Sequence, residues 1–180
     1  MKNPFLTGEK IYLSPITKED ISDEYIGWLN DKEVCRDNSH ATFPNNRTRA
    51  MEYVENAQQS KTDLVFTIRW KENDRHIGNA ALIRIDPVYR CADIVILIGN
   101  KDFWGRGVGT ECYRLLIDHG FRQLNLNRMA SGLTSRNKAM IKICEKVGMR
   151  KEGTLREAMF KDGQYLDVEL YAILRGEFKG

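Results

Sequence analysis

The chain has 180 residues, of which 42% are hydrophobic and 29% are charged, and its formal net charge at pH 7 is +3. This length and apolar content are enough for a buried core, so we expect a single domain over residues 1–180 and exclude a disordered chain. The small net charge, with no run of five like charges, does not favour a nucleic-acid scaffold.

Composition also bears on membrane, metal and compartment. No segment approaches the run of about 18 apolar residues that spans a membrane, and the first residues lack the apolar core of a signal peptide. The histidines lie far apart, and the cysteines form no C-x-x-C pair, which argues against zinc and against a disulfide framework. We therefore expect a cytoplasmic protein with reduced thiols, no metal, and no membrane or nucleic-acid partner. The cysteines are Cys35, Cys91, Cys112 and Cys144.

The first half of the chain predicts two helices and three strands. Apolar alternation indicates a strand that breaks at Pro15, and Thr17 begins a helix-start sequence. A second helical pattern precedes two strand-like runs that flank the turn-like residues 71–74, which predicts a hairpin. In chain order these predicted elements are 11–16, 17–30, 47–59, 64–70 and 77–85.

The second half alternates strands and helices and ends in a hairpin. A short apolar strand is followed by an amphipathic helix, then by a second strand and a second helix. No internal repeat and no linker rich in Pro, Gly or Ser divides the chain, so one mixed αβ domain is the simplest interpretation. These predicted elements are 93–98, 107–122, 127–133 and 136–147.

The segment Trp104–Thr110 joins the strand 93–98 to the helix 107–122 and contains three alternate glycines. Amide N–H groups at a helix start, together with the positive end of the helix dipole, suit an anion such as a pyrophosphate. The segment is not a P-loop, because Gly109 is followed by Thr110 and Glu111 and no lysine is present. Its glycine spacing also does not fit a dinucleotide fingerprint. A simple tight turn at a helix start is the structural alternative.

This loop resembles the acyl-CoA signature of the GNAT superfamily of N-acyltransferases, in which Gln or Arg is followed by two residues, Gly, one residue, and Gly or Ala. Gly107 and Gly109 match its glycines. Trp104 stands where Gln or Arg is usual, a departure that resembles the branch of ribosomal-protein N-terminal and spermidine acetyltransferases.

Four later segments resemble the same branch, in the same order. Ser135–Ala139 and Glu145–Met149 resemble the Asn-containing helix that closes with Lys, an apolar residue, Gly and Phe, with Met149 in place of Phe. Residues 152–157 and 162–167 resemble its terminal hairpin. The resemblance extends from about Lys10 to Leu174, and it implies an α/β (α+β) fold: a mostly antiparallel sheet of about seven strands, about four helices, and one splayed pair of parallel strands.

The resemblance also implies acetyl-CoA as acyl donor and assigns residues to it. Strand backbone at Ile96 and Ile98 would contact the pantetheine arm, an N–H near Ile98 would polarise the thioester carbonyl, and Asn137 would contact the pantetheine or the leaving thiol. Asn137 is also an ordinary helix-capping residue. The pyrophosphate would lie against Trp104, Gly105, Arg106, Gly107, Val108, Gly109 and Thr110.

Two residues are candidates for proton transfer. Asp93 stands where relatives often carry Glu, so it is a candidate base for the attacking amine, directly or through water; a strand-edge ion pair is the alternative. Cys144 stands where many relatives carry the Tyr that protonates the CoA thiolate. Its thiol is a candidate acid, and a small core residue is the alternative.

We therefore expect an N-acetyltransferase that acts on a primary amine: a protein N-terminus, polyamine, amino sugar or amino acid. The acceptor pocket is expected in the N-terminal third, from residues 21–30, 35–46 and 47–59, which do not identify the amine. The alternative is a non-enzymatic acyl-CoA-binding or sensing module on the same fold. A homodimer is expected by analogy only.

Overall fold

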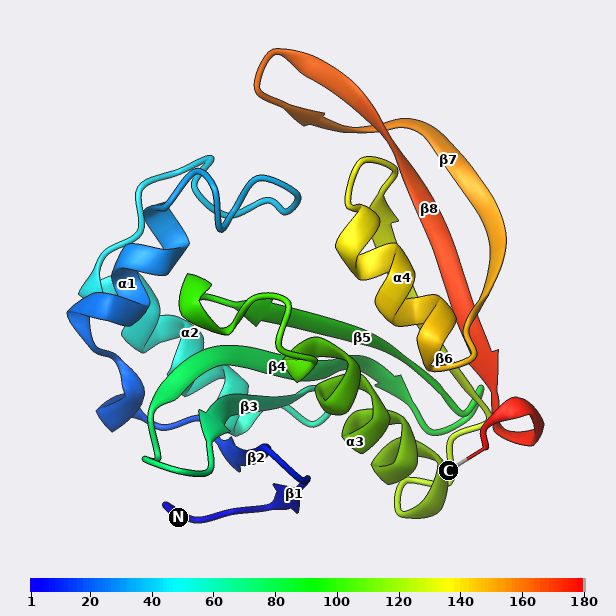
Figure 1. Ribbon diagram of the computed structural model, residues 1–180, viewed down its shortest axis with the longest axis horizontal. Helices are drawn as coiled ribbons and strands as arrows, with labels where there is room; N and C mark the ends of the chain where they lie inside the picture. Colours follow the sequence, from blue (N-terminus) through cyan, green and yellow to red (C-terminus); the bar gives the residue numbers. More distant parts are fainter. Residues whose placement is uncertain (180) are drawn as a thin grey trace.

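The computed structural model describes residues 1–179, and its strands form one eight-stranded sheet in the order β1-β2-β3-β4-β5-β6-β8-β7 (Figure 1). Every neighbouring pair is antiparallel except β5 and β6. This confirms the predicted mixed fold with one parallel pair. The strands are β1 (Leu6–Thr7), β2 (Ile11–Pro15), β3 (Leu64–Trp70), β4 (His76–Asp86), β5 (Cys91–Ile98), β6 (Arg128–Thr134), β7 (Arg150–Lys161) and β8 (Gln164–Leu174).

Helices occupy both faces of this sheet. Within residues 1–179, no helix is both long and apolar enough to cross a membrane. The α-helices are α1 (Asp23–Asn30), α2 (Arg47–Gln59), α3 (Val108–Arg122) and α4 (Lys138–Lys146), and the short 3-10 helices are η1 (Lys18–Asp20), η2 (Lys101–Phe103) and η3 (Arg175–Glu177).

The structure differs from the sequence-based expectation near the N-terminus. The short edge strand β1 was not predicted, and β2 ends at Pro15, one residue before the predicted end of the strand at Ile16. The helix predicted over residues 17–30 is divided into η1 and α1. The division has a local cause: Asp20 closes a capping box with Thr17, and Ser22 then caps a new helix by accepting a hydrogen bond from the Tyr25 N–H.

The parallel strands β5 and β6 pair over only three residues. Their register runs from Cys91 opposite Arg128 to Asp93 opposite Ala130. Beyond that point β5 stays paired with β4 as far as Ile98, while β6 stays paired with β8 as far as Thr134. The sheet therefore divides into two arms after Asp93, and the inner edges of both arms have no partner strand.

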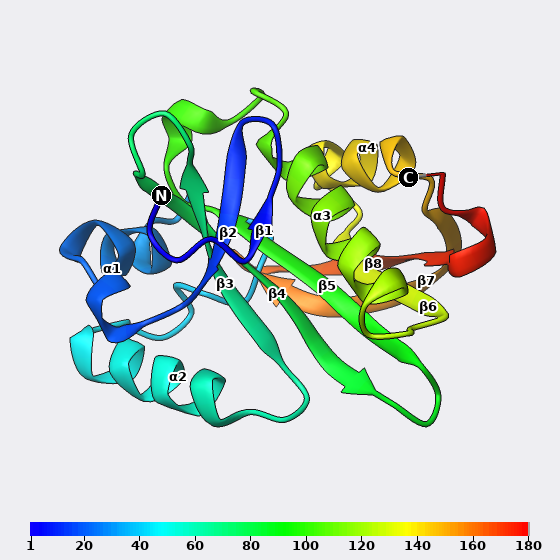
Figure 2. The same cartoon turned by 90° about the horizontal axis from the view of Figure 1, so that it is seen from below.

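The helices α1 and α2 lie on the opposite side of the sheet from α3 and α4 (Figure 2), and each pair covers its own apolar cluster. The larger cluster joins the sheet to α3 and α4, and it includes Val108, Leu116 and Val147. The smaller cluster joins the other face to α1 and α2, and it includes Trp28 and Val54. The opening between β5 and β6 thus connects two separately packed faces.

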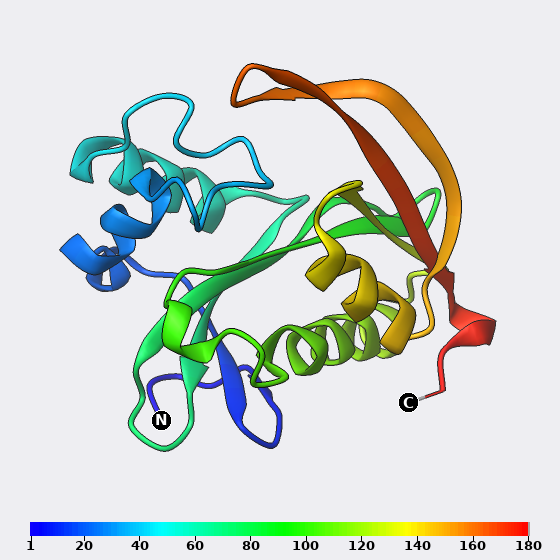
Figure 3. The same cartoon turned by 45° about the horizontal axis from the view of Figure 1, so that its top comes forward.

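The long hairpin β7–β8 curves away from the body of the sheet (Figure 3). Its tip returns to the segment 36–46, where Lys161 Nζ donates to the His40 carbonyl oxygen at 2.8 Å. Arg136, just before α4, pairs with Asp37 at 2.8 Å. Burial by itself would raise the pKa of Asp37, but hydrogen bonds from Arg136, Thr134 and Arg36 outweigh it and lower that pKa. These contacts connect the N-terminal third to the C-terminal arm.

A buried ion pair holds η1, and with it the start of α1, against the sheet. The Asp20 and Arg69 side chains are 5% and 9% exposed, and the guanidinium bonds directly to the carboxylate. Arg69 also donates to Ser14 Oγ at 3.2 Å, and Asp20 accepts from the Thr17 N–H at 2.8 Å. The charges of Asp20 and Arg69 therefore neutralise each other inside the fold.

Replacing Asp20 with Ala is expected to destabilise the protein by about 3–5 kcal/mol, because the Arg69 guanidinium would stay buried without its counter-charge. The matched control is Glu55→Ala, which removes the exposed pair with Lys18 and should cost about 0–1 kcal/mol. Urea unfolding measures both values. An equal loss of unfolding free energy in the two variants would contradict the stabilising role of the buried Asp20–Arg69 pair.

Candidate functional site

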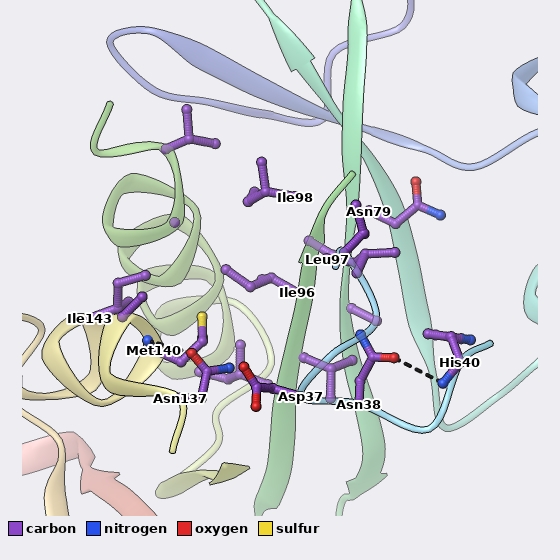
Figure 4. Close-up of a pocket in the computed structure, with 18 of the residues that line it drawn as sticks. Asp37, Asn38, His40, Asn79, Ile96, Leu97, Ile98, Asn137, Met140 and Ile143 are labelled. Carbon is purple, nitrogen blue, oxygen red and sulfur yellow. Dashed lines mark hydrogen bonds between the residues drawn. The ribbon is translucent and has the colours of Figure 1, made fainter. Parts of the chain in front are cut away.

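A cavity of about 750 Å³ lies at the opening between β5 and β6. Residues on both faces of the sheet line it: Ile143 and Met140 lie on one side of β5, and Asn79 and His40 lie on the other (Figure 4). The cavity therefore passes from the α3–α4 face to the α1–α2 face through the divided sheet. Two reacting molecules can therefore enter from opposite faces of the sheet and meet at the opening.

The glycine loop forms one end of this cavity. Gly107 is the N-cap residue of α3 in the left-handed conformation, with φ of 85°, and it supplies no side-chain cap. Gly107, Gly109 and Thr110 line the cavity. The first N–H groups of α3 are thus left for an anion, in the field of the helix dipole.

Of the two large side chains of the loop, Trp104 lines the cavity and Arg106 does not. The Trp104 indole N–H donates to the Ile98 carbonyl oxygen at 2.8 Å, which ties the loop to the end of β5. The Arg106 guanidinium lies over the Phe103 ring, 5.5 Å from its centroid, and Arg106 does not line the cavity. Positive charge comes instead from Lys142 and Lys146 of α4, one helical turn apart on the cavity wall.

Ile96 and Ile98 line the cavity as expected from the sequence. The Ile94 carbonyl faces the opening, because it accepts a hydrogen bond from Ser131 of β6. In a strand, alternate residues direct their backbone groups to the same edge, so the backbone groups of Ile96 and Ile98 face the opening too. The Ile98 carbonyl is already bonded to Trp104.

Asn137 also lines the cavity and caps α4 at the same time. Its side-chain oxygen accepts the Met140 N–H at 3.2 Å (Figure 4). The capping interpretation is therefore confirmed. The amide nitrogen, a donor, and the second lone pair of the amide oxygen are left to reach another group in the cavity.

A chain of hydroxyls closes the point where the two strands part. Ser131 is the first residue of β6 after the last pair, and its hydroxyl donates to the Ile94 carbonyl at 3.0 Å. The Tyr113 hydroxyl lies 2.8 Å from the same Ser131 oxygen. Because a carbonyl only accepts, the single Ser131 proton is committed to Ile94, and Tyr113 must be the donor to Ser131. A side chain thus replaces the missing ladder bond.

Cys144 lies behind this hydroxyl chain. Its side chain is fully buried next to the Tyr113 hydroxyl, and it does not line the cavity. Burial raises the pKa of the thiol to about 12, although the neighbouring hydroxyl lowers it in part. The role of Cys144 as an acid stays a prediction.

Asp93 lies at the last paired position of β5, at the apex of the opening. Its carboxylate forms an ion pair with Arg84 of β4, and Asp93 is not on the cavity wall. The strand-edge ion pair proposed as the alternative is therefore present, and a role as base stays a prediction.

The face under α1 and α2 adds polar groups that the sequence did not single out. Tyr25 and Asn79 line the cavity, and Asn79 Oδ1 lies 2.7 Å from His76 Nε2. Burial raises the pKa of Tyr25 to about 12. Two features of the sequence could have pointed to these polar groups: Asn79 and Ser131 are polar residues inside otherwise apolar strands. Within residues 1–179, no cluster of three His, Cys, Asp or Glu side chains could hold a metal ion.

Known proteins are similar to this chain in sequence and in fold. A family model described as an acetyltransferase (GNAT) domain matches residues 10–150. The probable N-acetyltransferase YjcK of Bacillus subtilis (strain 168) is 30% identical over 179 residues, covering 94% of this chain and 96% of the relative. The uncharacterized N-acetyltransferase p20 of Bacillus licheniformis is 35% identical over 115 residues, 64% of each chain.

A solved structure has the same architecture. The crystal structure of spermidine N-acetyltransferase from Vibrio cholerae in complex with CoA and spermine aligns with a TM-score of 0.85 and covers 94% of this chain and 98% of that chain. The sequence identity is 20%, so this likeness concerns the fold.

Replacing Ser131 with Ala is expected to destabilise the protein by about 1–3 kcal/mol, because the Ile94 carbonyl and the Tyr113 hydroxyl would both lose a buried partner. Tyr113→Phe should cost less, since Ser131 would still bond to Ile94. Urea unfolding of both variants checks the order. A larger loss for Tyr113→Phe would contradict the proposed direction of the hydroxyl chain.

Proposed function

The chain belongs to the GNAT family of acetyltransferases, and we propose that it transfers the acetyl group of acetyl-CoA directly to a primary amine at the opening between β5 and β6. The observation that carries this proposal is the cavity that crosses the divided sheet, with an anion-binding helix start on one face and polar groups on the other. Each substrate would approach from its own face.

The residues on the α3–α4 face fit acetyl-CoA. The uncapped N–H groups from Gly107 to Thr110 would hold the pyrophosphate, and Lys142 and Lys146 supply positive charge nearby. Acetyl-CoA supplies an activated acetyl thioester. The backbone of Ile96 and Ile98 would bond the pantetheine amides, because it lies on an edge without a partner strand. Asn137 would contact the pantetheine or the thiol end through its amide nitrogen.

The reaction needs a neutral amine and ends with a thiol. The amine nitrogen attacks the thioester carbonyl carbon, a C–N bond forms, the C–S bond breaks, and CoA leaves as the thiol after taking up a proton. An aliphatic ammonium with a pKa of about 10 must first lose a proton at neutral pH. We assign this deprotonation to Asp93, acting directly or through water from the apex of the opening. A backbone N–H near Ile98 would stabilise the oxyanion.

The amine remains to be identified by experiment. The candidate acceptors are a small-molecule amine or a peptide amine, and the spermidine acetyltransferase named above acts on one such amine. All four cysteines, described in full by the structure, are free thiols, which supports a reducing compartment such as the cytoplasm as the site of the reaction.

The direct test is release of CoA thiol from acetyl-CoA with N-terminal peptides, spermidine, amino-sugar nucleotides and free amino acids. A rate well above acceptor-free hydrolysis supports the enzyme and names its substrate class. Acetyl-CoA binding without turnover on any amine would favour the non-enzymatic binding module instead.

Replacing Gly107 with Ala is expected to weaken CoA binding about tenfold, because a left-handed conformation costs an alanine roughly 1–2 kcal/mol and relaxation would turn the helix-start N–H groups away. Gly163→Ala is the matched control. Gly163 also has a left-handed φ, of 78°, and, like Gly107, open space where a Cβ would stand, but it lies outside the cavity. Calorimetric titration with CoA should show the loss only for Gly107→Ala.

Replacing Asp93 with Asn is expected to lower kcat about a hundredfold, with the KM for acetyl-CoA nearly unchanged, because the proton acceptor is lost while the residues assigned to CoA are untouched. The control is Arg84→Met, which breaks the ion pair but keeps the carboxylate, and which should retain activity. An unchanged kcat for Asp93→Asn would remove Asp93 from the mechanism.

Cys144→Ala tests the second proton-transfer residue. Loss of a thiol that protonates the leaving group should lower kcat at least about tenfold, whereas a thiol that only packs against Tyr113 should affect unfolding and not kcat. Steady-state kinetics and urea unfolding of this one variant separate the two roles, and full activity would dismiss Cys144 as the acid.

A further inference from the structure

We call the part of the cavity beneath α1 and α2 the acceptor chamber. It lies on the face opposite the glycine loop and α4 (Figure 4). The residues that define it are Tyr25, Leu29, Asn38, Tyr53, Val65 and Asn79.

Much of the chamber wall is apolar surface open to the cavity. Val95 lies in the middle of the central strand β5, yet it is 44% exposed, and Tyr53 of α2 is 46% exposed. Both line the cavity, together with the apolar side chains of Leu29 and Val65. A ligand with an apolar body would cover this surface and gain hydrophobic free energy.

The two carboxylates on this side of the cavity are already neutralised. Glu33 accepts from Lys101 Nζ at 2.6 Å. Asp37 pairs with Arg136 at 2.8 Å and with Arg36 at 3.2 Å. Among the described lining residues of the chamber, no carboxylate is left without a cation.

Positive charge on the same side is less fully compensated. Arg49 lines the cavity and donates to the Pro44 carbonyl oxygen at 3.0 Å, and it forms no ion pair with any residue between 1 and 179. A second ammonium group entering here would lose its water without gaining a counter-charge, which is costly. It would also be repelled by the Arg49 guanidinium.

A chamber without a free carboxylate favours the reactive form of a single amine. Desolvation disfavours the charged ammonium, so it promotes the neutral nitrogen that attacks the thioester. Tyr25 and Asn79 offer uncharged hydrogen-bonding groups on the wall for that nitrogen.

We propose that the acceptor is a primary amine that carries one positive charge on an apolar or aromatic body, and that polyamines are poor acceptors. This inference rests on the proposed acetyl transfer for its biological meaning, but the binding preference can be measured separately. A small molecule and the terminus of a peptide can present the same chemistry, so the test has an arm for each.

The first experiment measures binding of amines to the full chain saturated with CoA, by calorimetric titration. The pair n-hexylamine and 1,6-diaminohexane has equal carbon length and differs by one charge, spermidine adds a third amine, and a leucine-initiated peptide amide represents a chain terminus. We expect one of the monoamines to bind at least about tenfold more tightly than both polyamines. Tighter binding of n-hexylamine would identify a small-molecule acceptor, and tighter binding of the peptide amide would identify a chain terminus.

The second experiment adds a carboxylate to the chamber. Asn38 Oδ1 accepts the His40 N–H at 2.9 Å, and Asn38→Asp keeps this bond while adding a negative charge. The matched control is Asn73→Asp, because Asn73 Oδ1 accepts the Arg75 N–H at 3.1 Å in a turn outside the cavity. Asn38→Asp should shift the ratio of affinities about tenfold toward the diamine, and Asn73→Asp should leave it unchanged.

The outcomes separate this inference from the proposed function. Equal or tighter binding of the polyamines, no binding of either monoamine, or an unchanged ratio in Asn38→Asp would overturn the inference. Selective monoamine binding without release of CoA thiol from acetyl-CoA would leave the inference standing and count against the proposed transfer.

Discussion

The parting of β5 from β6 is the constraint on which the rest of this molecule depends. Two parallel strands that pair at three positions and then diverge leave unpaired backbone groups inside the protein, which are costly without other partners. Ser131 satisfies the first of them at Ile94, and Trp104 satisfies another at Ile98. The backbone between these two points is left for a ligand. The opening is therefore held at both ends by side chains.

The two arms of the divided sheet stay in place because each has its own packing. The β1–β5 arm is covered by α3 on one face and by α1 and α2 on the other, and the Asp20–Arg69 pair secures η1 on that second face. The β6–β8–β7 arm returns to the N-terminal third through Arg136 and Lys161. The contact between Arg136 and Asp37 neutralises a carboxylate that lines the cavity. The same pairing that connects the arms thus leaves the acceptor chamber without a free carboxylate.

The two residues proposed for proton transfer are each engaged by a neighbouring side chain. Cys144 stands at the place of a family tyrosine, yet a tyrosine hydroxyl does reach this region, from Tyr113 of α3. Tyr113 lines the cavity, but its hydroxyl proton is donated to Ser131, so the hydroxyl is not a free donor there. Asp93 lies at the apex of the opening but is engaged with Arg84. The kinetics of single variants therefore decide the proton-transfer roles of Asp93 and Cys144, because residue type alone does not.

The sequence by itself determined the order of the main helices and strands from β2 onward, the glycine loop before α3 and the family, because local periodicity, turn glycines and short motifs are encoded by neighbouring residues. Gly107, Ile96 and Asn137 were recognisable for this reason, and all three line the cavity. Only the tertiary structure decided which side chains meet across it. Ser131 and Tyr113 are 18 residues apart, and Asp37 and Arg136 are 99 residues apart. Such partners are fixed by how the two arms pack, and no local pattern specifies that distance. The neutrality of the acceptor chamber follows from these long-range pairs, so it could not be read from composition.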